Sequence, residues 1–243
     1  MHAIAIHHAG EIYPLWGTQT SNRRYRNRSD PPRRRVVRLI FVRHGETDFN
    51  VERRYQGHTD SELSERGRQQ AVSVAKRLGA EPITAVYASD LRRASETARI
   101  IADVHDLQVC TDARLRECSF GDWEGLSAEE IQERYPKQYE NYRQDSVTYR
   151  APNGETLQSL MARVVSAVEE ITARHEDGHI VIVGHGGTVN SFICHALGAQ
   201  LSIFRRIRLD NCGLTIFHRE QGGRWVLEVL NDTCHLENQG QHS

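Results

Sequence analysis

The stretch Leu39-Ile40-Phe41-Val42-Arg43-His44-Gly45-Glu46-Thr47 decides how this chain folds, because an apolar run ends there in an arginine, a histidine and a glycine. The stretch Ile180-Val181-Ile182-Val183-Gly184-His185-Gly186-Gly187 repeats the pattern. Short, continuous apolar runs are typical of strands that are buried on both faces. Ligands of open α/β sheets bind beside the carboxyl ends of such strands. The two stretches therefore predict a pocket that contains His44 and His185.

The other segments predict a single α/β domain. A chain of 243 residues with 38% hydrophobic content can bury one full core. Predicted strands alternate with predicted helices, and the last two apolar runs, 214–217 and 225–230, flank Gly222-Gly223 as a hairpin. We expect a three-layer α/β/α sandwich over residues 37–237, with a mostly parallel central sheet and an antiparallel C-terminal hairpin. Residues 238–243 are expected to be a tail.

Several helix boundaries can be predicted from local signals. Ser64 precedes a helix that Gly79 closes, and Ser89 or Asp90 is expected to cap the following helix. A long polar stretch, 111–153, contains helical pieces near 127–134 and 136–144 and is expected to form a cap over a site. The segment Pro152-Asn153-Gly154-Glu155-Thr156 is expected to start a long amphipathic helix that runs to about Ala173.

The first segment, 1–36, has a composition of its own. Residues 1–37 carry seven arginines against two acidic residues, whereas residues 38–243 carry 24 basic and 30 acidic residues. The segment has no helical or alternating period, so we expect a disordered basic arm. Binding to nucleic acid or anionic lipid and a transit peptide are open alternatives. We favour a solvated tail or a start codon assigned too early, with no nucleic acid or membrane partner.

The cysteines and the hydropathy pattern limit the cellular setting. Five cysteines are scattered without a C-x-x-C pair, which predicts free thiols in a reducing compartment and supports neither zinc nor a disulfide framework. No apolar run approaches the length that spans a membrane, and the start has no signal-peptide pattern. We therefore expect a cytoplasmic protein.

Arginine and histidine at strand ends indicate phosphate chemistry. A phosphate monoester carries about two negative charges at neutral pH, and planar guanidinium groups bind them bidentately. Arg43 adjoins His44, and Arg93 falls on the first turn of a predicted helix. Asn50 can donate its side-chain amide to a phosphate oxygen. The backbone N–H groups of Gly186 and Gly187, at a helix start, add an anion site.

Five short motifs occur in the order known from one family: Arg43-His44-Gly45-Glu46-Thr47, Tyr55-Gln56-Gly57-His58-Thr59-Asp60, Ser89-Asp90-Leu91-Arg92-Arg93-Ala94, Leu115-Arg116-Glu117-Cys118-Ser119-Phe120-Gly121-Asp122-Trp123-Glu124-Gly125 and Gly184-His185-Gly186-Gly187. Over residues 37–237 the chain closely resembles the histidine phosphatase superfamily, in its phosphoglycerate-mutase-like branch. The resemblance implies a fold of the phosphoglycerate-mutase type.

The resemblance also implies a role for each catalytic residue. His44 would be the nucleophile that forms a phosphohistidine, and Glu117 would be the general acid, with Glu124 as its rival. Arg43, Arg93, Asn50 and His185 would hold the phosphoryl oxygens. The family needs neither metal nor cofactor, so we expect none here.

Further residues are expected at the edge of the site. Gln56, Gly57 and Thr59 would line the pocket mouth, and Gly186 would contribute its backbone N–H. His235 would reach a substrate carboxylate, although packing against the sheet edge is the alternative. Polar loop residues such as Gln56 and Thr59 commonly face water instead.

The predicted function is hydrolysis of a small phosphorylated metabolite. One alternative is a mutase that moves phosphate between hydroxyls of glycerate, but mutases resembling this branch carry an extra cap insertion, and the stretch between Gly125 and Pro152 is compact. A second alternative is a phosphate-binding module without catalysis. A metal hydrolase is disfavoured because two arginines would crowd a cation. The oligomeric state stays open, and a homodimer through an edge strand is compatible with the sequence.

Overall fold

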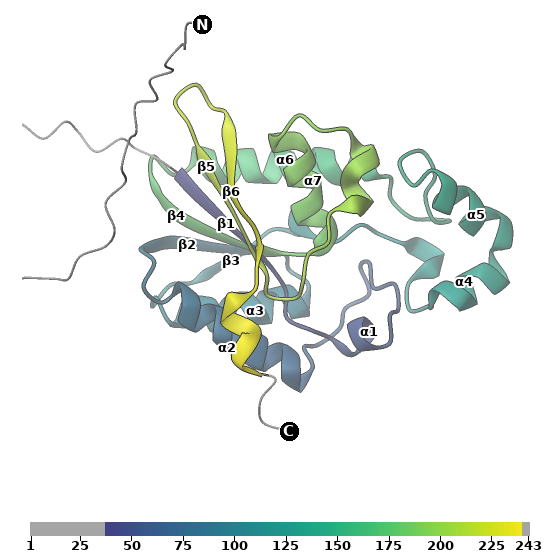
Figure 1. Ribbon diagram of the computed structural model, residues 1–243, viewed down its shortest axis with the longest axis horizontal. Helices are drawn as coiled ribbons and strands as arrows, with labels where there is room; N and C mark the ends of the chain where they lie inside the picture. Colours follow the sequence, from purple (N-terminus) through teal and green to yellow (C-terminus); the bar gives the residue numbers. More distant parts are fainter. Residues whose placement is uncertain (1–36, 240–243) are drawn as a thin grey trace, which may run out of the picture. The chain divides into compact units, whose positions relative to one another are not determined.

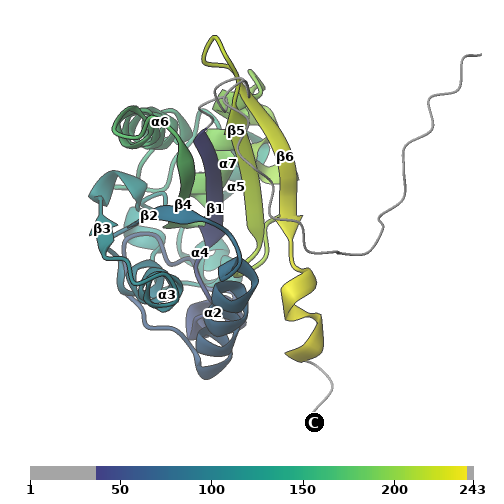
Figure 2. The same cartoon turned by 90° about the vertical axis from the view of Figure 1, so that its left-hand side faces the viewer.

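The computed structural model describes residues 37–239, so the predicted arm 1–36 and most of the predicted tail lie outside the described residues. Six strands form one mixed sheet in the order β3-β2-β4-β1-β5-β6. Figure 2 shows β3 and β6 at opposite edges of this sheet. The strands are β1 (Val37–Arg43), β2 (Ile83–Ala88), β3 (Val109–Thr111), β4 (Gly178–Gly184), β5 (Leu214–Arg219) and β6 (Trp225–Asp232).

The sheet is parallel at its centre and antiparallel on one side. β1 and β2 both pair in parallel with β4, whereas β5 pairs antiparallel with β1 and with β6. The predicted sandwich with a C-terminal hairpin is therefore confirmed. In the β1–β4 pair, Arg43 lies opposite Gly184. This register brings the two strands to an end side by side, with His44 and His185 as the next residues.

The helices cover both faces of the sheet. Figure 1 shows α6 and α7 on one side and α2 and α3 on the other. The helices are α1 (Asp48–Val51), α2 (Glu65–Leu78), α3 (Arg92–Asp103), α4 (Ala128–Arg134), α5 (Pro136–Gln144), α6 (Leu157–Ala173) and α7 (Gly186–Ala196), with 3-10 turns η1 (Ala113–Leu115), η2 (Gly121–Trp123), η3 (Leu201–Arg206) and η4 (Cys234–Gln239).

Alternation along β1 divides its side chains between the two layers. Leu39 and Phe41 pack in the cluster that includes α6 and α7, while Ile40 and Val42 pack in the cluster that includes α2 and α3. All four are fully buried. A strand covered on both faces needs apolar residues at every position, which explains the continuous run in the sequence.

Hydrogen bonds fix the helix starts, in two cases differently from expectation. Ser64 caps α2 as predicted. Leu91 occupies the cap position of α3 without a side-chain bond, because the Asp90 carboxylate instead accepts two hydrogen bonds from Arg116. The long helix α6 begins only after Thr156, which caps it. Of the expected starting segment 152–156, only Thr156 belongs to the helix start, because the Gly154 N–H donates to the Ala151 carbonyl and closes a turn before the helix.

The cap forms a small layer with its own core. α4 and α5 match the two predicted helical pieces and lie together beyond one end of the sheet (Figure 1). The fully buried Trp123 packs edge-on against Tyr139 and Tyr142, with ring centroids 5.7 and 5.0 Å away. This aromatic cluster gives the polar segment enough buried area to hold a fixed position.

In the part of the chain that the structure describes, no helix combines the length and the apolar character needed to cross a bilayer.

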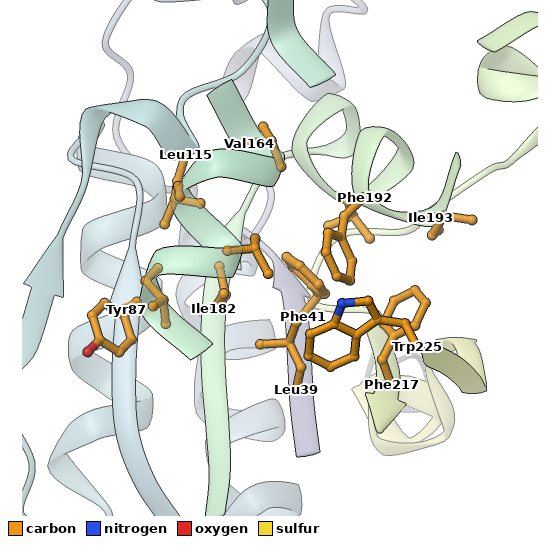
Figure 3. Close-up of a cluster of buried hydrophobic side chains, with 14 of the residues drawn as sticks. Leu39, Phe41, Tyr87, Leu115, Val164, Ile182, Phe192, Ile193, Phe217 and Trp225 are labelled. Atoms are coloured by element: carbon orange, nitrogen blue, oxygen red, sulfur yellow. The ribbon is translucent and has the colours of Figure 1, made fainter. Parts of the chain in front are cut away.

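We predict that Phe41→Ala lowers the free energy of unfolding by about 3–5 kcal/mol, because it leaves a cavity in the core. The Phe41 ring lies 5.1 Å from that of Phe192 and 6.1 Å from that of Phe217 (Figure 3). Urea denaturation measures the loss. Val51→Ala is the control, since Val51 is 64% exposed, and it should cost less than about 0.5 kcal/mol. A loss below about 1 kcal/mol for Phe41→Ala would contradict this packing.

Candidate active site

The two predicted histidines lie together at the ends of β1 and β4. The backbone N–H of His44 donates to the carbonyl of Gly184 at 2.9 Å, which continues the strand pairing by one residue. The rings of His44 and His185 have centroids 5.1 Å apart. Their residues are 3% and 0% exposed. Two imidazoles therefore share one buried site, as the two sequence stretches predicted.

A backbone carbonyl fixes the tautomer of His44. Its Nδ1 lies 2.7 Å from the carbonyl oxygen of Gly45, an acceptor that requires Nδ1 to carry the proton. The Nε2 lone pair is then free. Burial lowers the pKa of His44 well below 6.5, and the positive charges of Arg93 and Arg43 lower it further. The ring is therefore neutral at physiological pH and holds an unprotonated nitrogen.

Two buried guanidinium groups accompany the histidines. Arg93 is 0% exposed and donates to the carbonyl oxygens of Gly57 and Thr59 at 2.8 and 2.9 Å. Arg43 donates to the carbonyl of Leu209 at 2.5 Å. Burial lowers the pKa of Arg93 to about 10, against the opposing charge of Glu117, so the group stays protonated at neutral pH. The site is therefore strongly positive.

Several nitrogens of this site have no hydrogen-bond partner among the described residues. They are the Nε atoms of Arg43 and Arg93 and both ring nitrogens of His185. Burying a polar group without a partner is costly, and the cost is larger for a charged group. Unpaired guanidinium donors beside two imidazoles are a suitable environment for an oxyanion.

A cavity of about 300 Å³ opens beside His44. Seven predicted residues line it, namely Arg43, His44, Asn50, Gln56, Gly57, Arg93 and Glu117. The Asn50 Oδ1 accepts from the backbone N–H and the hydroxyl of Thr47, and from Asn211. Asn50 therefore completes the capping box of α1, whose N-cap is Thr47, and it also lines the cavity. Because its oxygen is engaged, the amide nitrogen is the group able to donate there.

Backbone groups orient the carboxylate of Glu117. Its oxygens accept from the N–H of Cys118 at 2.7 Å and of Gly187 at 3.1 Å. A Cβ at Gly187 would lie 1.9 Å from a Glu117 oxygen, so any larger residue there would displace this carboxylate. Arg163 donates to the carbonyl of Glu117 at 2.7 Å and so holds the segment. The carboxylate is thus fixed at the edge of the cavity.

Glu124 supports the loop instead of facing the cavity. Its carboxylate accepts hydrogen bonds from the N–H groups of His58, Thr59 and Phe120 and from the hydroxyls of Thr59 and Ser119. Burial acts to raise its pKa, but these hydrogen bonds outweigh burial and lower the pKa. A carboxylate held in its ionised form is a poor proton donor, which favours Glu117 over its rival.

Three residues that were expected to contact the substrate, Thr59, Gly186 and His235, do not line the cavity. The Thr59 hydroxyl donates to Glu124 at 2.8 Å, and Thr59 does not line the cavity. At the start of α7, the Gly187 N–H donates to Glu117 and Gly186 is not a lining residue, so this helix start binds a carboxylate of the protein itself. The His235 Nε2 lies 3.0 Å from the carbonyl oxygen of Cys212, away from the cavity lining. The placement of His235 therefore matches the alternative, in which the ring packs against the protein, and its contact with a substrate carboxylate stays a prediction.

The structure adds residues that the sequence did not assign. Phe49, Arg53, Tyr55 and Phe120 line the cavity. Asn211 donates to the carbonyl of His44 at 2.9 Å and to Asn50 at 3.3 Å. The backbone of Arg53 has a φ of 54°, an uncommon conformation for a non-glycine residue. Tyr55 and Phe120 belong to two of the five sequence motifs, and this membership could have identified them as site residues.

The donors for a metal site are not assembled in residues 37–239, where no group of three or more histidine, cysteine, aspartate or glutamate side chains could hold a metal ion.

The chain belongs to the histidine phosphatase superfamily, branch 1, whose family model matches residues 39–233. It is 36% identical over 201 residues to phosphoserine phosphatase 1 of Hydrogenobacter thermophilus, covering 83% of this chain and 95% of the relative. It is 39% identical over 205 residues to phosphoglycerate mutase-like protein 4 of Arabidopsis thaliana, covering 83% and 88%. A mycobacterial glucosyl-3-phosphoglycerate phosphatase, solved in complex with VO3, superposes with a TM-score of 0.74 and 34% identity, covering 81% and 99%.

We predict that the free energy of unfolding falls as the pH decreases from about 7 to about 5. The pKa values of buried His44 and His185 lie well below 6.5, whereas in the unfolded chain both titrate near their ordinary value. Below that value the unfolded state binds protons that the folded state does not. Each histidine then contributes a slope that approaches about 1.4 kcal/mol per pH unit.

Urea denaturation across this pH range measures the slope. His44→Gln should reduce it by the contribution of one proton, because glutamine does not titrate. Equal stability at both ends of the range, or a slope that the substitution leaves unchanged, would contradict a neutral buried His44.

Proposed function

We propose that the chain hydrolyses phosphate monoesters of small metabolites through a phosphohistidine at His44. One observation carries the proposal: the free Nε2 of a neutral histidine shares a buried site with unpaired donor nitrogens of Arg43, Arg93 and His185. A phosphoryl group has the negative oxygens that these donors need, and its phosphorus accepts the nitrogen lone pair.

In the first step, the His44 Nε2 attacks phosphorus and the bond from phosphorus to the ester oxygen breaks. The proton stays on Nδ1, which donates to the Gly45 carbonyl, and this hydrogen bond stabilises the developing positive charge of the ring. Arg43, Arg93 and His185 donate to the phosphoryl oxygens. Glu117 in its acid form donates a proton to the departing alkoxide, which leaves as the alcohol.

In the second step, water attacks the phosphorus of the phosphohistidine. The Glu117 carboxylate takes a proton from that water while the P–N bond breaks. Inorganic phosphate and the neutral His44 ring result, with Glu117 protonated again. The same two side chains therefore complete a cycle without net change.

The relatives support the substrate class. Their printed names include phosphatases for phosphoserine and for a glucosylated phosphoglycerate. We further propose that the reaction is independent of metal, because two guanidinium groups supply the positive charge that a metal would otherwise provide. We also retain a cytoplasmic location, with a small phosphorylated substrate as the partner and a homodimer as one possible assembly.

Phosphoryl transfer between hydroxyls is the second candidate. It is favoured by the 39% identity to a protein named phosphoglycerate mutase-like. It shares the first step, but a second hydroxyl replaces water in the second. The two activities differ in whether inorganic phosphate accumulates from 3-phosphoglycerate, with and without a bisphosphate primer.

We predict that His44→Ala abolishes turnover and prevents acid-labile labelling of the protein by a radiolabelled phosphate ester. The reason is that the substitution removes the atom that forms the P–N bond. Rapid acid-free quenching followed by gel autoradiography measures the label. His195→Ala is the control, since His195 is exposed on α7, and it should keep both activity and label. Labelling that persists in His44→Ala would identify a different nucleophile.

We predict that Glu117→Gln slows alkyl phosphates by about 10²- to 10⁴-fold and slows p-nitrophenyl phosphate much less. A basic alkoxide needs a proton in order to leave, whereas p-nitrophenolate does not. Single-turnover rates with both esters measure the difference. An equal loss for the two leaving groups would show that Glu117 does not act as the acid.

A further inference from the structure

A second cavity, of about 410 Å³, lies on the other side of Glu117. It shares Tyr55, Glu117 and Phe120 with the first cavity. The carboxylate of Glu117 therefore stands at the boundary between the two spaces. Under the proposed function, the ester oxygen lies beside this carboxylate, so the phosphoryl group and the alcohol fall on opposite sides of it. The second cavity is accordingly placed to hold the alcohol.

Arg205, on η3, gives this cavity a positive charge. Its guanidinium carbon lies 4.2 Å from the centroid of the Tyr142 ring, a cation–π contact that orients the group. Within the described part of the chain, no carboxylate lies within 4 Å of this guanidinium to form an ion pair. Arg205 and the next residue, Arg206, are both exposed, but only Arg205 lines the cavity. Arg205 thus presents an oriented fork of donors that matches a carboxylate.

Asn190, on α7, gives the same cavity an acceptor. Its Nδ2 donates to the carbonyls of Phe204 and Ile207, both at 3.1 Å, and so holds the segment that carries Arg205. These two carbonyls settle the orientation of the amide. The residue is 7% exposed, and its Oδ1 is buried without a partner among the described residues. A buried acceptor in this state can take a hydrogen bond from a ligand donor.

We propose that the second cavity binds an alcohol that carries both a carboxylate, held by Arg205, and a hydrogen-bond donor, held by the Asn190 Oδ1. This inference rests on the proposed function and names its substrate class: phosphate monoesters of small hydroxy acids with an amino or hydroxyl group beside the carboxylate. Leu157, Phe204 and Ile207 form the apolar part of the lining and favour a compact carbon skeleton.

Three esters separate the two contacts. O-phosphoserine has the carboxylate and the donor, 3-phosphonooxypropanoate has the carboxylate alone, and phosphoethanolamine has the donor alone. In the unmodified enzyme, phosphoserine should have the highest kcat/KM. Arg205→Gln should lower kcat/KM by about 10-fold for the two carboxylated esters and leave phosphoethanolamine and p-nitrophenyl phosphate unchanged. Arg206→Gln is the matched control and should alter none of them.

Two results would overturn the inference. One is an equal effect of Arg205→Gln on esters with and without a carboxylate, and the other is no effect on any of them. If phosphoserine and 3-phosphonooxypropanoate have equal kcat/KM in the unmodified enzyme, the role of Asn190 fails.

Binding distinguishes failure of this inference from failure of the proposed function. Calorimetry with the three esters measures dissociation constants without turnover when both the unmodified Arg205 form and Arg205→Gln carry His44→Ala. If no ester releases phosphate, hydrolysis is disproved, yet weaker binding of phosphoserine to Arg205→Gln would still support the cavity assignment. If p-nitrophenyl phosphate is hydrolysed and Arg205→Gln binds phosphoserine as tightly as the unmodified protein does, the cavity assignment alone is disproved.

Discussion

The burial of two guanidinium groups beside two neutral imidazoles is the constraint on which the site depends. Removal from water lowers the pKa of Arg43, Arg93, His44 and His185 alike, because each charged form loses its hydration. The carbonyls of Gly57, Thr59 and Leu209 satisfy part of the arginine donors. Carbonyl dipoles do not neutralise two full charges. The protein therefore holds a positive potential in a confined space, which favours the entry of a doubly charged anion.

The sheet converts this electrostatic constraint into a defined geometry. The parallel register of β1 and β4 places Arg43 opposite Gly184, so the residues that follow leave the sheet at the same level. The hydrogen bond from the His44 N–H to the Gly184 carbonyl fixes the separation of the two rings at the backbone. Strand ends are rigid because their side chains are packed on both faces. His44 and His185 directly follow two such strands, so their backbone positions are fixed as well.

Features determined by local sequence could be predicted, and features determined by distant contacts could not. The apolar runs, the Ser64 cap and the cap helices depend on neighbouring residues, and the structure agrees with them. Asp90 has a typical capping sequence, but Arg116, 26 residues later, binds its carboxylate. The sequence around Gly187 indicates a free backbone N–H that could bind an anion. In the structure this N–H donates to the carboxylate of Glu117, 70 residues earlier. Partners that are distant in the sequence can bind a polar group in place of its neighbours, and the sequence around that group does not indicate this.

Glu117 and Glu124 show how position separates two nearby carboxylates of one motif. Glu124 accepts five hydrogen bonds that tie residues 58–59 to residues 119–120, and the carbonyls of this loop in turn orient Arg93. Its ionised form is thereby stabilised, which suits a structural role. Glu117 accepts two backbone hydrogen bonds and lines both cavities. Acid chemistry requires contact with the leaving oxygen, so location between the cavities, and not residue type, distinguishes the two roles.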